Sequence, residues 1–162
     1  MRILIAAAAI TLCAGTAHAE LYSNAKYGFS ITVPDMLEVG REEPDAGDGM
    51  RSHSADQKAD FTAYAGFLLD SSFAAEVKGN ISQEEGGGWK VSYRKLGNKK
   101  WATYSGAKNG RIFYVRSIPS CHGGAIALYR LEYPAADKAK YNPIIKALND
   151  SFIDNDGCKL SN

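Results

Sequence analysis

The sequence lacks most of the short motifs by which enzymes and metal proteins are recognised. It contains no G-x-S-x-G serine motif, no glycine-rich loop ending in G-K-S/T and no C-x-x-C pair. It has no internal repeat, heptad pattern or low-complexity tract either. No particular reaction is therefore specified by these residues, and we expect a non-enzymatic protein that needs no cofactor and no bound metal.

Long apolar runs are also scarce, because the only one lies at the N-terminus. Arg2 precedes an apolar run over residues 3–13, and Ala17-His18-Ala19 follows it. This is the pattern of a cleavable secretory signal peptide, and the run is too short to span a bilayer. We expect cleavage after residue 19, a single domain over residues 20–162 that does not span a membrane, and a bacterial periplasmic location. A lipid anchor at Cys13 is disfavoured by the large Leu12 before it.

Only two cysteines, Cys121 and Cys158, remain once the predicted signal peptide is removed. In an oxidising compartment such a pair favours a disulfide. The sequence S-C-H-G-G around Cys121 leaves a second hypothesis open, in which Cys121 is a nucleophile beside His122. A metal site with Cys121, His122, Cys158 and His53 as ligands is a third, but their spacing is not that of known zinc sites.

Hydrophobic periodicity predicts an α+β domain. Alternating apolar residues predict strands over residues 27–33, 50–54, 60–69, 89–96, 100–108, 111–118 and 125–134, and the acidic, glycine-rich residues 39–50 predict a loop. Apolar residues at helical spacing predict a short helix after residue 70 and a longer one over residues 141–152, with Asn142 as its cap and Pro143 at its first position. We expect an antiparallel sheet of about six or seven strands, a meander in its second half, covered by the helices.

Several core and capping residues carry a resemblance to a known family. They are Tyr27, Gly28, Phe29, Trp101, Tyr133, Pro134, Tyr141, Pro143 and Phe152. With them the chain resembles the small secreted bacterial proteins of the PsbP-like class, which share an α/β/α sandwich with the photosystem protein PsbP and with nuclear-transport Mog proteins. The resemblance implies this fold and assigns no reaction, because the proteins of the class have different partners.

Charge is unevenly distributed along the chain. Residues 34–85 contain twelve acidic and four basic side chains, whereas residues 86–131 contain nine basic and no acidic ones. Basic and aromatic residues alternate in one predicted hairpin, which holds Trp89, Lys90, Arg94, Lys95, Lys99, Lys100 and Trp101. Such a pattern suits an anionic partner, although the two halves of the chain can also neutralise each other on an ordinary surface. Nucleic acid is also bound this way, but secretion argues against it.

The function that these features favour is binding in the bacterial envelope. We expect a monomeric, non-enzymatic periplasmic protein that binds a partner protein or an anionic envelope ligand. One alternative is a secreted inhibitor or immunity-type protein that blocks a partner enzyme. Another is a small hydrolase or thiol oxidoreductase that uses Cys121 and His122. His53, near Asp56 and Asp60, is a candidate general base. The interpretation that we favour is an exposed hairpin histidine with no catalytic role.

Overall fold

Seven antiparallel strands form the main sheet of the computed structural model, which describes residues 19–69, 71–98 and 100–158. Their order in the sheet is β3-β4-β5-β9-β8-β7-β6. The strands are β3 (Val39–Glu42), β4 (Gly49–His53), β5 (Asp60–Phe67), β6 (Lys90–Gly97), β7 (Trp101–Lys108), β8 (Arg111–Ser120) and β9 (Ala125–Pro134). The predicted α+β class, the strand number and the meander from β6 to β9 are confirmed. The predicted signal peptide lies outside the described residues except for Ala19.

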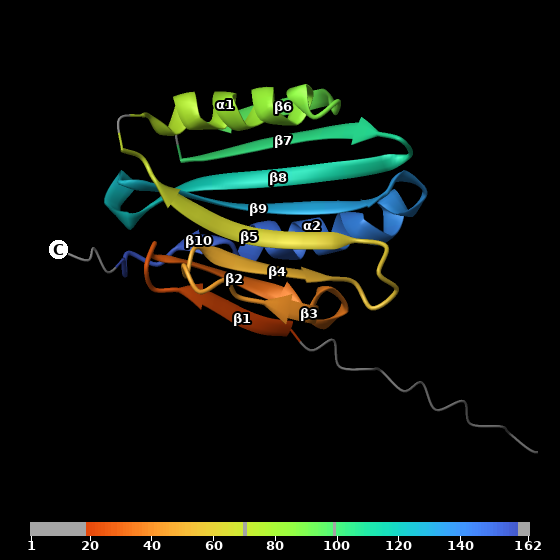
Figure 1. Cartoon of the computed structure of the whole chain (residues 1–162), viewed down its shortest axis with the longest axis horizontal. Coiled ribbons are helices and arrows are strands. Elements are labelled where there is room, and N and C mark those ends of the chain that lie inside the picture. The colour runs from red at the N-terminus through yellow and green to blue at the C-terminus, as the bar shows by residue number, and fades with distance from the viewer. Residues whose placement is uncertain (1–18, 70, 99, 159–162) are drawn as a thin grey trace, which may run out of the picture.

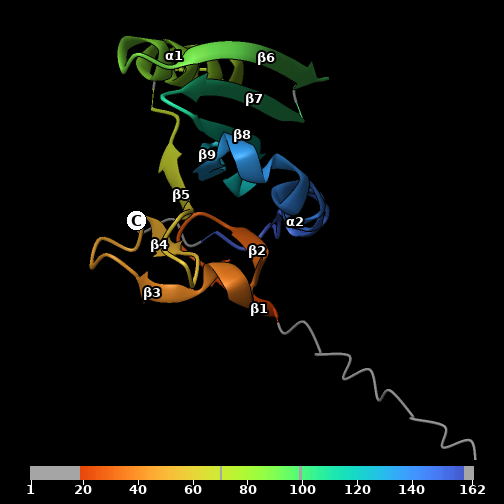
Figure 2. The same ribbon diagram turned by 90° about the vertical axis from the view of Figure 1, so that its right-hand side faces the viewer.

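One helix packs on one side of the main sheet, and a second helix and a smaller sheet pack on the other side. Helix α1 (Phe73–Gly86) lies in front of the β6 end in Figure 1, and helix α2 (Lys138–Ser151) lies behind the middle strands. The smaller sheet consists of β1 (Ala19–Asn24), β2 (Phe29–Pro34) and β10 (Ile153–Asp154), in the order β1-β2-β10. Figure 2 shows α2 and this small sheet on one side of the main sheet.

Side chains of the central strands alternate between the two faces of the sheet, and this alternation produces two hydrophobic cores. In β9, Tyr129 and Leu131 face α2 and the small sheet, whereas Leu128 packs with Val77 of α1. Both sets are buried, because each face of the central strands is covered. The α1 core spans β6 to β9 and the other core lies over β4, β5 and β9. The α2 side of β6 and β7 is therefore left without a covering element.

The prediction of a loop over residues 39–50 is wrong in part, because β3 occupies its first four residues. Strand β3 is an edge strand that pairs only with β4, with a register shift between Val39 and Glu42. Gly40 has a φ of +63° and a side chain there would collide with the His53 ring, so this position requires glycine. Such a short, exposed strand has no apolar alternation by which a sequence would reveal it.

The predicted start of the last helix is also wrong. Helix α2 begins at Lys138, after a short 3-10 turn (Ala135–Asp137), so Asn142 does not cap it and Pro143 lies inside it. A proline there removes one helical hydrogen bond. The buried ring of Tyr141 compensates by stacking on Tyr133, with ring centroids 4.6 Å apart. Tertiary packing therefore extends the helix by one turn before Pro143.

Candidate functional site

Cys121 and His122 lie at the turn between β8 and β9. Cys121 is buried and bonded to Cys158, with their Cα atoms 5.1 Å apart, and His122 is exposed. The disulfide joins the turn to the tail after α2, as expected for two cysteines in an oxidising compartment. In this state the Cys121 sulfur is not available as a nucleophile. The hypothesis of a hydrolase or thiol oxidoreductase that uses Cys121 and His122 therefore lacks its nucleophile.

The remaining candidates from the sequence do not assemble into a reactive cluster. The His53 ring packs over Gly40 near the β3 edge. Among the described residues, no group of three or more histidine, cysteine, aspartate or glutamate side chains is arranged to hold a metal ion. Within the same residues, the helices are too short or too polar to cross a membrane.

The basic and aromatic cluster of the sequence is divided between the two faces of the β6–β7 hairpin. Trp89 packs edge-on against Phe113 in the α1 core, at a centroid distance of 5.1 Å, and Arg94 forms an ion pair with Glu85 of α1. The ammonium of Lys95, in contrast, lies 5.6 Å from the Trp101 ring on the α2 side. Lys100 is exposed in the hairpin turn, and Lys99 lies outside the described residues.

Adjacent residues such as Arg94 and Lys95 face opposite sides by ordinary alternation, but the separation of Trp89 from Lys95 results from a β-bulge in β6. Lys90 pairs with Ala107 and Val91 with Gly106, but the next regular pair is Tyr93 with Ser105. One extra residue thus lies between Val91 and Tyr93, and it reverses the alternation of the strand. Val91 packs toward the α1 core, whereas Tyr93 faces the α2 side. The bulge therefore brings Tyr93 and Lys95 to the uncovered face of the hairpin.

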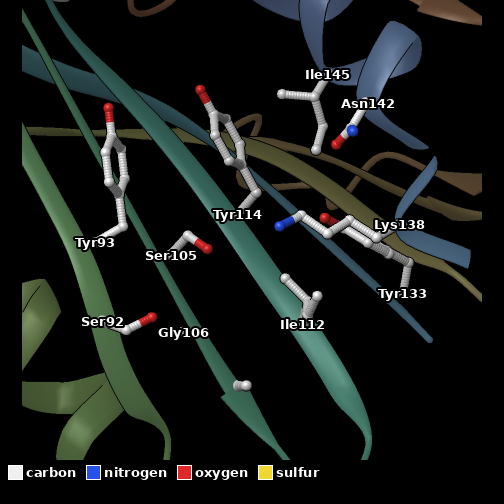
Figure 3. Close-up of a pocket in the computed structure, with 11 residues that line it drawn as sticks. Ser92, Tyr93, Ser105, Gly106, Ile112, Tyr114, Tyr133, Lys138, Asn142 and Ile145 are labelled. Atoms are coloured by element: carbon white, nitrogen blue, oxygen red, sulfur yellow. The ribbon is translucent and has the colours of Figure 1, made fainter. Parts of the chain in front are cut away.

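A groove of about 390 Å³ lies on this uncovered face, between α2 and the β6–β7 hairpin. We call it the tyrosine groove. Its lining residues are Ser92, Tyr93, Ser105, Gly106, Ala107, Ile112, Tyr114, Tyr133, Lys138, Asn142 and Ile145. In Figure 3, Tyr93 and Tyr114 stand on either side of Ser105, and the side chains of Lys138 and Asn142 approach from α2. The volume is within the range of small-molecule binding sites.

One wall of the groove is held by hydrogen bonds and stacking. The Asn149 amide nitrogen donates to the Tyr114 hydroxyl at 2.8 Å, and the Tyr129 hydroxyl donates to the Asn149 amide oxygen at 2.8 Å. The Tyr114 and Tyr129 rings stack with centroids 6.0 Å apart. Burial raises the pKa of Tyr129 well above its usual value, and its neighbour Tyr114 adds to the effect. Tyr129 therefore remains a neutral donor, and Tyr114 has a fixed orientation.

We expect Asn149→Ala to lower the free energy of unfolding by about 1 to 3 kcal/mol, because the buried Tyr129 hydroxyl would lose its acceptor. Urea unfolding measures this change. Asn142→Ala is the matched control, since Asn142 is exposed on the same helix and should change stability by less than about 0.5 kcal/mol. Equal losses in the two variants would show that the Tyr114–Asn149–Tyr129 contacts do not stabilise the wall.

Arg116 differs in its ion pairing from the other arginines that the structure describes. Within the described part of the chain, five arginines lie within 4.0 Å of a carboxylate: Arg41, Arg51, Arg94, Arg111 and Arg130. Arg116 has no such partner there, and its guanidinium carbon lies 4.7 Å from the Trp101 ring. Lys90, Lys95 and Lys138, around the same face, likewise have no ion-pair partner among the described residues. The described part of the chain thus provides no carboxylate that neutralises these positive charges near the groove.

Sequence reasoning found Lys95 and Trp101 but missed the groove itself. Tyr93, Ser105 and Tyr114 come from three strands, and only the register of the ladder places them side by side. The unpaired Arg116 was also missed, because its neighbours in sequence resemble those of any outward strand residue. Two sequence signals pointed to this region: the run without acidic residues from 86 to 131, and the basic and aromatic hairpin within it.

The arrangement of layers is that of the PsbP-like α/β/α sandwich. The Ran-binding protein Mog1p of Saccharomyces cerevisiae is similar in structure, with a TM-score of 0.62 and 8% identity over 87% of this chain and 97% of Mog1p. Cyanobacterial PsbP (CyanoP) from Synechocystis has a TM-score of 0.61 and 11% identity, over 90% of this chain and 97% of CyanoP. These likenesses show the fold. No protein-family model matches the sequence, and no curated protein matches it.

Proposed function

We propose that this chain is a non-enzymatic binding protein of the bacterial periplasm, and that it binds an anionic envelope ligand in the tyrosine groove. One observation carries the proposal: Lys95, Arg116 and Lys138 lie on the face that holds the groove and have no ion-pair partner among the described residues. Unneutralised cations beside a concave, partly apolar surface favour an anionic ligand.

Three further observations support binding over catalysis and a location outside the cytosol. The Cys121 sulfur is bonded to Cys158, so the thiol alternative lacks its nucleophile in this state. The predicted signal peptide over residues 1–19 supports secretion. Mog1p, which is similar in fold, is a Ran-binding protein, so this sandwich serves as a binding scaffold in at least one other protein.

Reversal of two charges beside the groove tests the proposal. The double variant Lys90→Glu and Lys95→Glu should lose most of the retention of the protein on isolated bacterial envelopes at low salt, because electrostatic attraction to an anionic ligand becomes repulsion. Retention of the unmodified protein should also fall as salt is added. Both effects are measured by co-sedimentation of purified protein with envelope fragments over a series of salt concentrations.

The double variant Lys58→Glu and Lys78→Glu is the matched control. It makes the same change in net charge at two exposed lysines that lie away from the groove, in the turn before β5 and on α1. Retention close to that of the unmodified protein is the expected result for this control. If both variants lose retention equally, net charge alone governs the attraction and the groove has no part in it.

A further inference from the structure

Side chains on the α2 side of β6, β7 and β8 form rows across the strands. Lys95 pairs with Thr103, and Thr103 pairs with Arg116; we call these three residues the cationic row. Two residues further along β7, Tyr93 pairs with Ser105 and Ser105 pairs with Tyr114, which we call the tyrosine row. Along β7 the backbones of the two rows are about 7 Å apart, because a strand rises about 3.3 Å per residue.

The cationic row contains two polar atoms that lack a hydrogen bond in the described part of the chain. The Nε of Arg116 and the Oγ1 of Thr103 are buried and have no hydrogen-bond partner among the described residues. Lys95 and Arg116 both lie against the Trp101 ring, at 5.6 and 4.7 Å from its centre. Two cations held on one indole without a carboxylate repel each other, and an anion between them would relieve this repulsion through charge-assisted hydrogen bonds.

The spacing of the strands that carry the tyrosine row suits a slot for one ring. Tyr93 and Tyr114 come from strands two positions apart, so their backbones are separated by about 9.6 Å. A ring that contacts both side chains at about 3.5 to 4.0 Å fits this separation. Tyr114 is fixed by Asn149 and Tyr129, whereas Tyr93 is 48% exposed and free to adjust. The slot thus has one fixed wall and one adaptable wall.

The polar groups around the slot suit a ring that carries hydroxyls. The hydroxyls of Ser92 and Ser105 and the amide of Asn142 line the groove, and each of them can both donate and accept hydrogen bonds. A purely aromatic ring would make no hydrogen bonds to these groups. A sugar ring has apolar C–H faces that pack on tyrosine and hydroxyls at its edge, so it satisfies both kinds of lining group.

We propose that the two rows form one binding site for an acidic sugar. The sugar ring lies between Tyr93 and Tyr114, and its carboxylate or phosphate binds Lys95 and Arg116. This inference rests on the proposed function, which it narrows from any anionic ligand to one chemical class. The same chemistry can come from a free acidic sugar or from a unit of an acidic polysaccharide.

Calorimetric titration of the purified, disulfide-intact protein tests the inference. The probes are galacturonate, polygalacturonate and glucose 6-phosphate, with neutral galactose and glucose as their controls. We expect at least one acidic probe to bind about tenfold or more tightly than its neutral counterpart, since hydrogen bonds to charged groups contribute that much. Tighter binding of polygalacturonate than of galacturonate would identify a polymer as the source, and equal binding would identify the free sugar.

Single substitutions distinguish the contribution of the cationic row to binding from that of the tyrosine row. Arg116→Gln should weaken binding of the acidic probe about tenfold or more and leave the weak binding of the neutral sugar unchanged. Tyr93→Ala should weaken both, because the ring loses one wall. Lys78→Gln, on α1, is the control and should change neither. Tyr93 is half exposed, so this variant should remain folded even if Arg116→Gln does not, and thermal unfolding checks both.

Failure of this inference can be distinguished from failure of the proposed function. If the Lys90 and Lys95 reversal abolishes envelope retention, but acidic and neutral sugars bind equally, the groove face binds an anion that is not an acidic sugar and the inference is overturned. Tighter binding of benzoate than of galacturonate would also overturn it, since the slot would then prefer an aromatic ring. If every groove variant keeps both its envelope retention and its sugar binding, both proposals are overturned.

Discussion

Removal of the disulfide by the double variant Cys121→Ala and Cys158→Ala should lower the free energy of unfolding by about 3 to 4 kcal/mol. The bond joins residues 37 positions apart, and the loop between them contains β9, α2 and β10. Without the bond, the unfolded chain gains the conformational entropy that loop closure had removed. Urea unfolding of the variant and of the unmodified protein measures the difference.

The unmodified protein in excess reductant is the control for the substitutions. It should unfold at nearly the same urea concentration as the double variant, and its intact mass should rise by about two hydrogens when the bond is reduced. If the variant instead unfolds at the same urea concentration as the oxidised protein, the denatured chain does not gain entropy on loss of the bond. The stability would then have to come from packing alone.

The bond acts at some distance from the tyrosine groove. Cys158 follows β10, whereas the groove residues of α2, Lys138 and Asn142, lie near the start of that helix. Stacking of Tyr141 on Tyr133 holds this part of the helix against β9. We therefore regard the disulfide as a determinant of stability and the tyrosine stack as the contact that positions the polar rim of the groove.

The strands of the meander were predictable because local signals and tertiary pairing agree. The dipeptide Asn109-Gly110 has φ values of 48° and 76°, as a two-residue hairpin turn requires, and it joins β7 to β8 where the sequence predicts. Strand β9 was recognisable from its continuous apolar residues, which reflect burial on both faces. Such agreement made the fold class accessible from the sequence.

Elements whose partners are distant in sequence were not predictable in the same way. Strand β10 has two residues and pairs with Phe29 and Ser30 of β2, far away along the chain. Strand β1 is exposed at most of its positions, and it coincides with the region where the signal peptide was expected to end. These strands are defined by backbone pairing, which leaves little trace in side-chain patterns.

The candidate site depends on a similar non-local feature. Plain alternation along β6 would place Trp89, Tyr93 and Lys95 on one face, and the sequence analysis assigned the residues of this hairpin to no particular face. The bulge after Val91 sends Trp89 into the α1 core and Tyr93 and Lys95 to the opposite face. A sequence cannot show a bulge without its partner strand, so the basic hairpin was found but its binding face was not.

Truncation of Phe113 should have the largest effect of any single substitution in the α1 core. Phe113 is fully buried on β8, and its ring packs edge-on against Trp89 at 5.1 Å and Tyr104 at 6.0 Å. We expect Phe113→Ala to lower the free energy of unfolding by about 3 to 5 kcal/mol, because it removes buried apolar area and leaves a cavity under α1. Urea unfolding followed by circular dichroism measures the change.

Phe113→Leu is the control, because it keeps most of the apolar volume and should cost less than the alanine variant. Tyr114, the next residue, faces the groove on the other side of β8, so a folded Phe113→Leu protein should bind acidic sugar as the unmodified protein does. A cost for Phe113→Ala no greater than that of an exposed position would mean that α1 does not close a core over β8. The opposite face would then have to supply nearly all the stability, and the sheet would not join two cores.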